Sequence, residues 1–182
     1  SKLNDLSSEV LRALTAAQVG ALTTEQFSGL STTALSSIST SAMAQLNTKQ
    51  IASLTTLQVS SLSSTSVQAL SAAQLAAMET ADLAVLSSTN LAVLSSAQLK
   101  GLTTTQLSGL STTALSQVST GALAGLNSAQ MASLTTTQVA GLTSAAVRAL
   151  STTQLAAMET ADVAVLNSTN LAALSSVQVQ AL

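Results

Sequence analysis

The sequence contains no proline, histidine, cysteine, tryptophan or tyrosine, and Phe27 is its only aromatic residue. Without cysteine the chain can form no disulfide and no thiolate metal site, so cysteine usage leaves the redox compartment undetermined. Without histidine a serine nucleophile lacks its usual base, and no Ser-x-x-Lys sequence replaces it. The core must therefore be built from small and medium aliphatic side chains.

Charge is also scarce. Five basic and seven acidic residues give a net charge of −2 without any basic stripe, which argues against nucleic acid as a partner. Ser, Thr and Gln recur every few residues, so no apolar run approaches the roughly 18 residues of a membrane span. With 47% hydrophobic residues, the chain nevertheless has enough apolar side chains to fold. We expect a soluble protein without membrane insertion.

An eight-residue repeat fills the sequence without a single insertion or deletion. A large aliphatic residue stands at every eighth position from Leu6 to Leu182, and a second apolar series stands three residues before each of these. Ser, Thr, Asn or Glu directly follows each member of the first series. The consensus is [ST]-[ST]-x-Q-[LV]-x-x-L, and residues 1–182 form a single array of about 22 octapeptides.

The octapeptide predicts a short capped helix. Ser, Thr and Asn are favoured N-cap residues, and Gln three residues later completes a capping box, as in Thr15 and Gln18. Leu14 and Val19 hold the positions of a hydrophobic staple. Because the next cap arrives eight residues later, each helix can last only about a turn and a half, and neighbouring repeats must supply its burial. We therefore predict an all-α solenoid, or superhelix, with one helix per repeat.

Two other folds are less compatible with the repeat. In one continuous helix an eight-residue step advances by roughly 80° beyond two turns, so the apolar residues would spiral around it. A β-solenoid is the stronger alternative, although the apolar spacing of three and five does not match the two-residue period of a strand. The sequence leaves open how many repeats close one superhelical turn and which hand the superhelix takes.

A period of eighty residues, or ten octapeptides, is superimposed on the repeat, so that residues 22–101 correspond to residues 102–181. Duplication of a ten-repeat block is the simpler interpretation, and a superhelical or partner spacing is the alternative. The first twelve residues hold four of the twelve charges, which suggests a polar capping repeat. Those four charged residues are Lys2, Asp5, Glu9 and Arg12.

Little in the sequence suggests chemistry. The only acidic pairs are Glu79 with Asp82 and Glu159 with Asp162, in two copies of the motif METAD. Since they occupy the cap and Gln positions, we interpret them mainly as helix N-terminal charges, and otherwise as a weak Ca²⁺ site with too few ligands of its own. The Ser and Thr pairs would form a regular ladder on one side of a solenoid, a surface able to bind glycan or ice. We predict no cofactor, no catalytic residue and no enzymatic activity.

The octapeptides LTTTQVAGL, LTTTQLSGL and LSSAQLKGL resemble the LTTxQ(V/L/I)xAL arrays of very large repetitive bacterial proteins. The resemblance covers essentially the whole chain. It implies a secreted or cell-surface, adhesin-like protein of which this chain is a repeat segment. The expected function is structural, as a stalk, spacer or self-assembling fibre that associates end to end or with other surface proteins, and the alternative is a module that binds glycan, ice or Ca²⁺.

Overall fold

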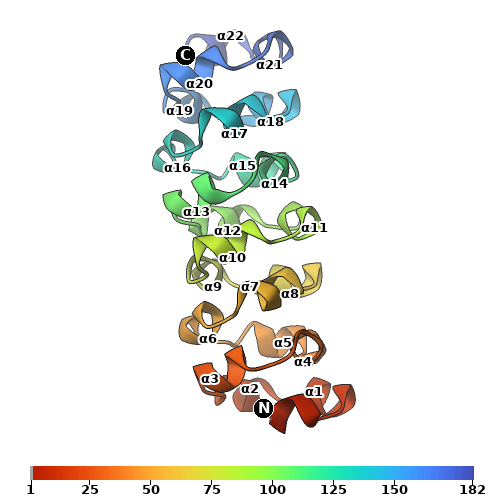
Figure 1. Ribbon diagram of the computed structural model, residues 1–182. Coiled ribbons are helices and arrows are strands. Elements are labelled where there is room, and N and C mark those ends of the chain that lie inside the picture. Colours follow the sequence, from red (N-terminus) through yellow and green to blue (C-terminus); the bar gives the residue numbers. More distant parts are fainter. Residues whose placement is uncertain (1) are drawn as a thin grey trace.

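The computed structural model describes residues 2–182, which form an elongated stack of short helices (Figure 1). A 3₁₀-helix, η1 (Lys2–Asp5), precedes α-helices of four to six residues, one in each octapeptide. Residues 2–182 contain no strand, so the β-solenoid alternative is wrong, and the single continuous helix is wrong as well. The α-helices are α1 (Ser8–Ala13), α2 (Ala16–Gly20), α3 (Thr24–Ser28), α4 (Thr32–Ser37), α5 (Thr40–Met43), α6 (Thr48–Ala52), α7 (Thr56–Ser60), α8 (Ser64–Ala69), α9 (Ala72–Ala76), α10 (Thr80–Ala84), α11 (Ser88–Ala92), α12 (Ser96–Gly101), α13 (Thr104–Gly109), α14 (Thr112–Ser116), α15 (Thr120–Leu123), α16 (Ser128–Ala132), α17 (Thr136–Ala140), α18 (Ser144–Ala149), α19 (Thr152–Leu155), α20 (Thr160–Ala164), α21 (Ser168–Ala172) and α22 (Ser176–Val179).

The helices begin where the caps predict. Thr23 has an extended backbone, and its hydroxyl accepts a hydrogen bond of 3.2 Å from the Gln26 N–H. The Gln26 side-chain oxygen in turn accepts one of 3.0 Å from the Thr23 N–H. Thr15 and Gln18 form the same capping box. Two of the N–H groups left without partners at a helix start are thereby satisfied in each such repeat.

The helices end without any special backbone conformation. In α3 the Leu30 N–H donates to the Phe27 carbonyl at 3.1 Å, which closes a final 3₁₀-type turn. The chain then passes through the extended cap Ser31 into the next helix. No residue of the described chain has a positive φ. The extended cap residue, joined in some repeats by an extended residue before it such as Ile38, therefore redirects the chain, which explains why so few glycines are needed.

Successive helices wind around a common axis, and we call one full circuit a coil. Each helix packs against the helix three repeats later, as α3 does against α6 and α6 against α9. Side-chain hydrogen bonds also join many of the helices to the one four repeats earlier, for example from Gln106 of α13 to the carbonyls that end α9. One coil thus contains between three and four octapeptides.

Ten helices complete three coils. Three steps between coils span nine to twelve helices, and the path from α3 through α6 and α9 to α13 spans ten. Figure 1 shows α3 and α13 on the same side of the stack, as it does α8 and α18, or α1, α11 and α21. Eighty residues divided over three coils give about 27 residues per coil. The eighty-residue sequence period therefore equals a whole number of coils, and a duplicated ten-repeat block keeps the orientation of every helix about the axis.

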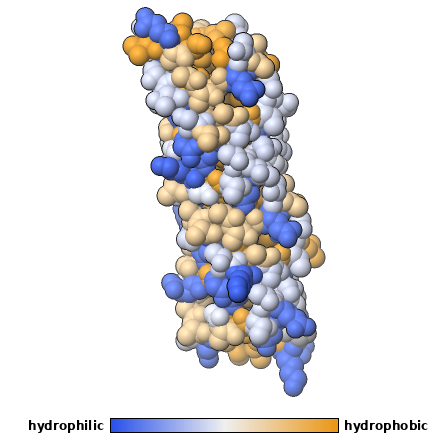
Figure 2. All heavy atoms as spheres, turned by 90° about the vertical axis from the view of Figure 1, so that its left-hand side faces the viewer, coloured by the Kyte–Doolittle hydropathy of each residue, from blue (hydrophilic) through white to orange (hydrophobic). Residues whose placement is uncertain are grey.

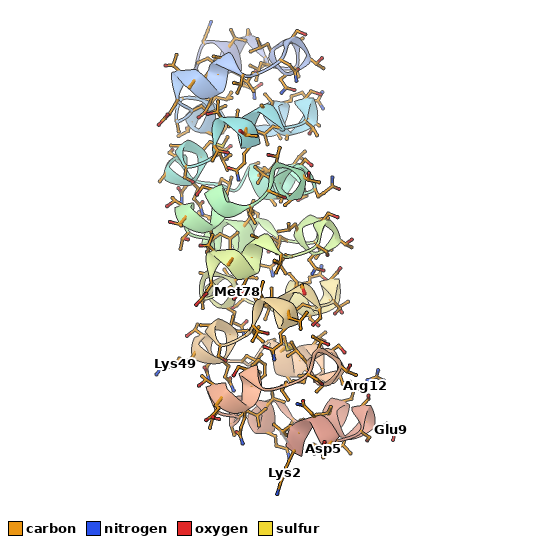
Figure 3. All side chains as sticks on the ribbon, in the orientation of Figure 1. Lys2, Asp5, Glu9, Arg12, Lys49 and Met78 are labelled. Carbon is orange, nitrogen blue, oxygen red and sulfur yellow. The ribbon has the colours of Figure 1, made fainter. Side chains whose placement is uncertain are left out.

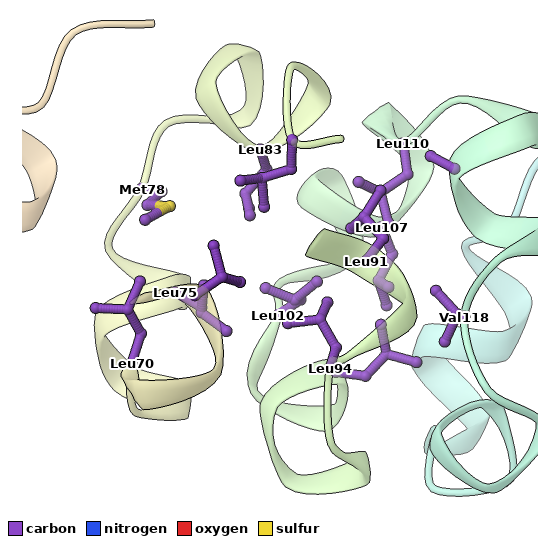
Figure 4. Packing of buried hydrophobic residues seen from close by; sticks show 14 of the residues in the cluster. Leu70, Leu75, Met78, Leu83, Leu91, Leu94, Leu102, Leu107, Leu110 and Val118 are labelled. Atoms are coloured by element: carbon purple, nitrogen blue, oxygen red, sulfur yellow. The ribbon is translucent and has the colours of Figure 1, made fainter. Parts of the chain in front are cut away.

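The two apolar series form one continuous core along the axis (Figure 4). The series within the helices lies deepest, and Phe27, Ile51 and Leu75 are fully buried. The series before the caps packs around it, with Leu54 and Leu62 almost as deeply buried. Each coil buries its side chains against the coils before and after it, as in other solenoids. None of the described helices has the length and hydrophobicity needed to cross a membrane.

The N-terminal segment lies across the first coil. Asn4 of η1 donates a 2.9 Å hydrogen bond to the Gly29 carbonyl and accepts one of 2.7 Å from the Ser31 N–H. Figure 3 shows Lys2, Asp5, Glu9 and Arg12 gathered at this end of the stack. These hydrogen bonds hold η1 against the first coil, and the capping repeat stays a prediction.

Candidate functional site

The most regular polar feature of the structure is a set of hydrogen bonds between coils. They start from the third helical residue, N3, which is Gln in the consensus. The Gln50 amide nitrogen donates to the carbonyl oxygens of Val19, Gly20 and Leu22 at 3.0, 3.3 and 2.8 Å. Its side-chain oxygen accepts from the Asn47 N–H at 3.0 Å. One side chain thereby caps its own helix and satisfies carbonyls at the end of the helix four repeats earlier.

The same pattern recurs with the same spacing along the solenoid. In each case the Gln nitrogen bonds to the carbonyl 28 residues earlier and to one or both of those 30 and 31 residues earlier. These glutamines are between 1% and 8% exposed, whereas Gln18 and Gln26, which have no earlier coil to reach, are exposed. The residues with these inter-coil hydrogen bonds are Gln50, Gln58, Gln74, Gln98, Gln106, Gln130, Gln138, Gln154 and Gln178.

Sequence reasoning assigned these glutamines only to capping boxes and missed their second role. A capping box accepts Glu as readily as Gln at N3. Glu nevertheless never occupies this position, although Gln occupies it eleven times. A carboxylate could cap the helix but has no N–H to donate to the next coil. The exclusion of Glu was the available signal for these inter-coil hydrogen bonds.

The inter-coil hydrogen bonds are concentrated on part of the circumference. Helices with Ala, Ser or Asn at N3 lie together on the right of Figure 1. Asn90 and Asn170 make a single bond each to the carbonyl 28 residues earlier, at 3.0 and 3.2 Å, and the Ala residues make none. Because ten helices make three coils, this side keeps its composition along the stack. Its helices are α4, α5, α8 and α11, followed by α14, α15, α18 and α21.

The METAD carboxylates lie at the starts of α10 and α20. Glu79 and Glu159 hold the cap positions and are exposed, and the Glu79 side chain makes no capping hydrogen bond. Asp82 and Asp162 hold the N3 positions and are 4% and 3% exposed. The Asp162 carboxylate accepts a 3.3 Å hydrogen bond from the Glu159 N–H. Both pairs thus lie at helix N-termini, but the aspartates point into the interior.

The carboxylates of residues 2–182 form no metal-binding cluster. No three Asp or Glu side chains of that segment gather closely enough to hold a metal ion. A shallow hollow between α18 and α21 has Arg148 as its only ionisable group. Ser, Thr or Asn caps most of the helices all around the stack, and a hydroxyl surface that binds glycan or ice stays a prediction.

Comparison with known families is decisive on architecture. The sequence profile of the ALTTAQ repeat matches residues 3–32, 75–112 and 155–182. The chain belongs to the ALTTAQ repeat family. The last letter of that name corresponds to the N3 glutamine of the two LTTTQ segments in this chain, Gln106 and Gln138, which join the coils. The match confirms the predicted octapeptide array. No curated protein matches the chain in sequence.

Proposed function

We propose that this ALTTAQ array is a structural segment, a stalk or spacer that holds other parts of a protein apart. The observation that carries the proposal is the repetition of one inter-coil connection, from N3 Gln to the helix four repeats earlier, along the stack. Such a connection depends only on neighbouring coils. The array can therefore lengthen by whole repeats without any change in its design.

The composition of the surface favours a function as a spacer over one as a binding module. Charged side chains are few and scattered, and Figure 2 shows hydrophilic and weakly hydrophobic side chains alternating along one face without a large patch in the middle of the stack. The repeats present nearly the same polar surface again and again. A spacer needs no more than this, because its function lies in its length and stiffness.

The proposed location is the bacterial cell surface or the extracellular space. The support is the resemblance of the octapeptides to arrays in very large repetitive bacterial proteins of that kind. An adhesin-like role follows from the same resemblance, with the array extending a binding domain away from the cell. Secretion can be checked by fractionating cells that express the parent protein and probing each fraction with an antibody against the repeat.

The end of the stack that carries the C-terminus is suited to self-association. Leu171, Val177, Val179 and Leu182 are 43%, 62%, 53% and 43% exposed there, and Figure 2 shows hydrophobic side chains gathered at that end. In a fibre-forming version of the proposed function, these exposed apolar side chains would contact a second copy.

Small-angle X-ray scattering on an absolute scale, across a concentration series, tests the proposal. A spacer gives the mass of one chain and a maximum dimension several times its cross-section at every concentration. Mass and length that grow together with concentration identify the fibre-forming version. A compact monomer with the radius of gyration of an ordinary globular domain of this length, about 16 Å, would exclude both.

A further inference from the structure

The inter-coil hydrogen bonds divide the circumference of the solenoid into two parts. Ten helices in three coils give ten helix positions around the axis, and each helix lies about three tenths of a circuit beyond the one before it. This step places α4, α11, α8 and α5 at four successive positions, although the chain visits them in a different order. None of the four has Gln at N3. We call this part, with α14, α15, α18 and α21 of the second block, the glutamine-free side.

Neighbouring coils on the glutamine-free side are joined by very few hydrogen bonds. Within residues 32–182, the side-chain hydrogen bonds that cross between coils there all involve Asn90 or Asn170. The other N3 residues of this side are Ala or Ser and are between 1% and 8% exposed. These small buried side chains hold the coils together by packing alone.

The opposite side of the stack is connected differently. The Gln74 amide nitrogen of α9 donates to three carbonyl oxygens at the end of α5, at 3.2, 3.3 and 2.7 Å. The Gln106 nitrogen of α13 donates to three at the end of α9, at 3.3, 3.2 and 2.7 Å. Separating two coils here would break these bonds and leave buried carbonyls without a donor, which is costly. Separating them on the glutamine-free side exposes only small side chains with little apolar area.

We propose that the solenoid bends in one preferred direction, by separation of neighbouring coils along the glutamine-free side. The helices joined by Gln stay together and act as the hinge, since local opening takes place where the fewest interactions must be broken. Because ten helices make three coils, this side keeps its place around the axis in both ten-repeat blocks. Small openings at successive coils therefore add up to one bend and do not cancel. The inference stands whether or not the array functions as a spacer.

Distances between paired spin labels, measured by double electron–electron resonance, test the proposal. Labels can be attached to introduced cysteines alone, since the chain has no cysteine of its own. Thr65→Cys with Ala145→Cys labels exposed positions of α8 and α18, on the glutamine-free side and three coils apart. Lys49→Cys with Ala129→Cys labels the matching exposed positions of α6 and α16, which Figure 1 shows on the other side. We expect a broader distance distribution for the first pair, because distances close to a hinge hardly change.

Two further variants exchange the character of the two sides. Asn90→Gln with Ala114→Gln supplies inter-coil donors between α8 and α18 and should narrow the distribution of that pair. Gln74→Asn with Gln106→Asn shortens two donors, leaving at most the single bond that Asn90 makes, and should broaden the distribution between α6 and α16.

Circular dichroism checks that each variant keeps its helices, and Asn90→Gln alone replaces the first variant if Gln at position 114 prevents folding. Equal widths for the two label pairs in the chain without these variants overturn the proposal, as does a broader distribution between α6 and α16. A folded Gln variant whose distribution between α8 and α18 stays as broad as before overturns it as well.

Discussion

The side-chain nitrogen of Gln58 lies 2.8 Å from the carbonyl oxygen of Leu30, a residue 28 positions earlier in the chain. The side-chain oxygen of Gln58 accepts a 2.8 Å hydrogen bond from the Thr55 N–H and thereby caps the helix that contains Gln58. Local helix formation and the stacking of coils therefore depend on one side chain. In the ALTTAQ repeat, one of the eight positions thus serves both helix capping and the stacking of coils.

Substitution of this residue separates its two roles. Gln58→Glu keeps the capping oxygen, removes the donor and places a charge against buried carbonyls. We expect it to lower the free energy of unfolding by about 1–3 kcal/mol or more, measured by urea denaturation. The control is Gln18→Glu, because Gln18 makes the same capping box without reaching another coil, and its effect should stay within about 0.5 kcal/mol. Equal losses in the two variants would show that only the cap matters.

Close approach of neighbouring coils requires glycine at particular places. A Cβ atom on Gly101 would lie 2.5 Å from the Ala72 Cβ and 3.1 Å from the Ala72 Cα, so the backbone of α9 would have to move. Gly101→Ala should destabilise the chain by about 1–3 kcal/mol in chemical denaturation. Gly121 also lies in a helix but has nothing within 4 Å of such an atom. Gly121→Ala should therefore stabilise by about 0.5–1 kcal/mol, and a loss of stability there would contradict this account of the packing.

Self-association at high concentration is expected to involve the end that carries the C-terminus. Val177→Ser combined with Val179→Ser should reduce the growth of mass with concentration, measured by sedimentation velocity, because it removes exposed apolar surface from that end. Leu57 is 70% exposed but lies in α7, away from both ends. If Leu57→Ser reduces association as much as the valine pair, lateral packing rather than end-to-end contact is responsible.

The sequence predicted each helix well because its determinants are local. The Thr23 cap, the Gln26 capping box and the Phe27 position all lie within five residues of one another, and each has a known preference at a helix start. The staple pattern likewise indicated which residues are buried. The predicted all-α solenoid is confirmed for this reason.

The arrangement of coils could not be derived in the same way. Whether α6 packs on α3 or on α2 depends on small backbone rotations at every extended cap, which accumulate over three or four repeats. No single residue type determines the total of these backbone rotations. The burial of Asp82 and Asp162 depended on this arrangement, so the sequence identified the METAD motif but not that its aspartates are buried.

A disulfide scan measures the stacking of the coils most directly, since the chain has no cysteine of its own. A Cβ atom on Gly109 would lie 4.0 Å from the Thr80 Cβ, within the range of a disulfide. The variant Thr80→Cys with Gly109→Cys should form an intramolecular disulfide under mild oxidation, seen as a mobility shift on a non-reducing gel. Thr112→Cys with Gly141→Cys should do the same, because a Cβ atom on Gly141 would lie 3.6 Å from the Thr112 Cβ.

The pair Thr80→Cys with Gly141→Cys uses the same positions in a mismatched combination and should remain reduced as a monomer. Rapid intramolecular cross-linking of both matched pairs, and not of the mismatched one, is the result that this arrangement of coils predicts. Failure of the matched pairs to cross-link, or equal cross-linking of all three, would contradict it.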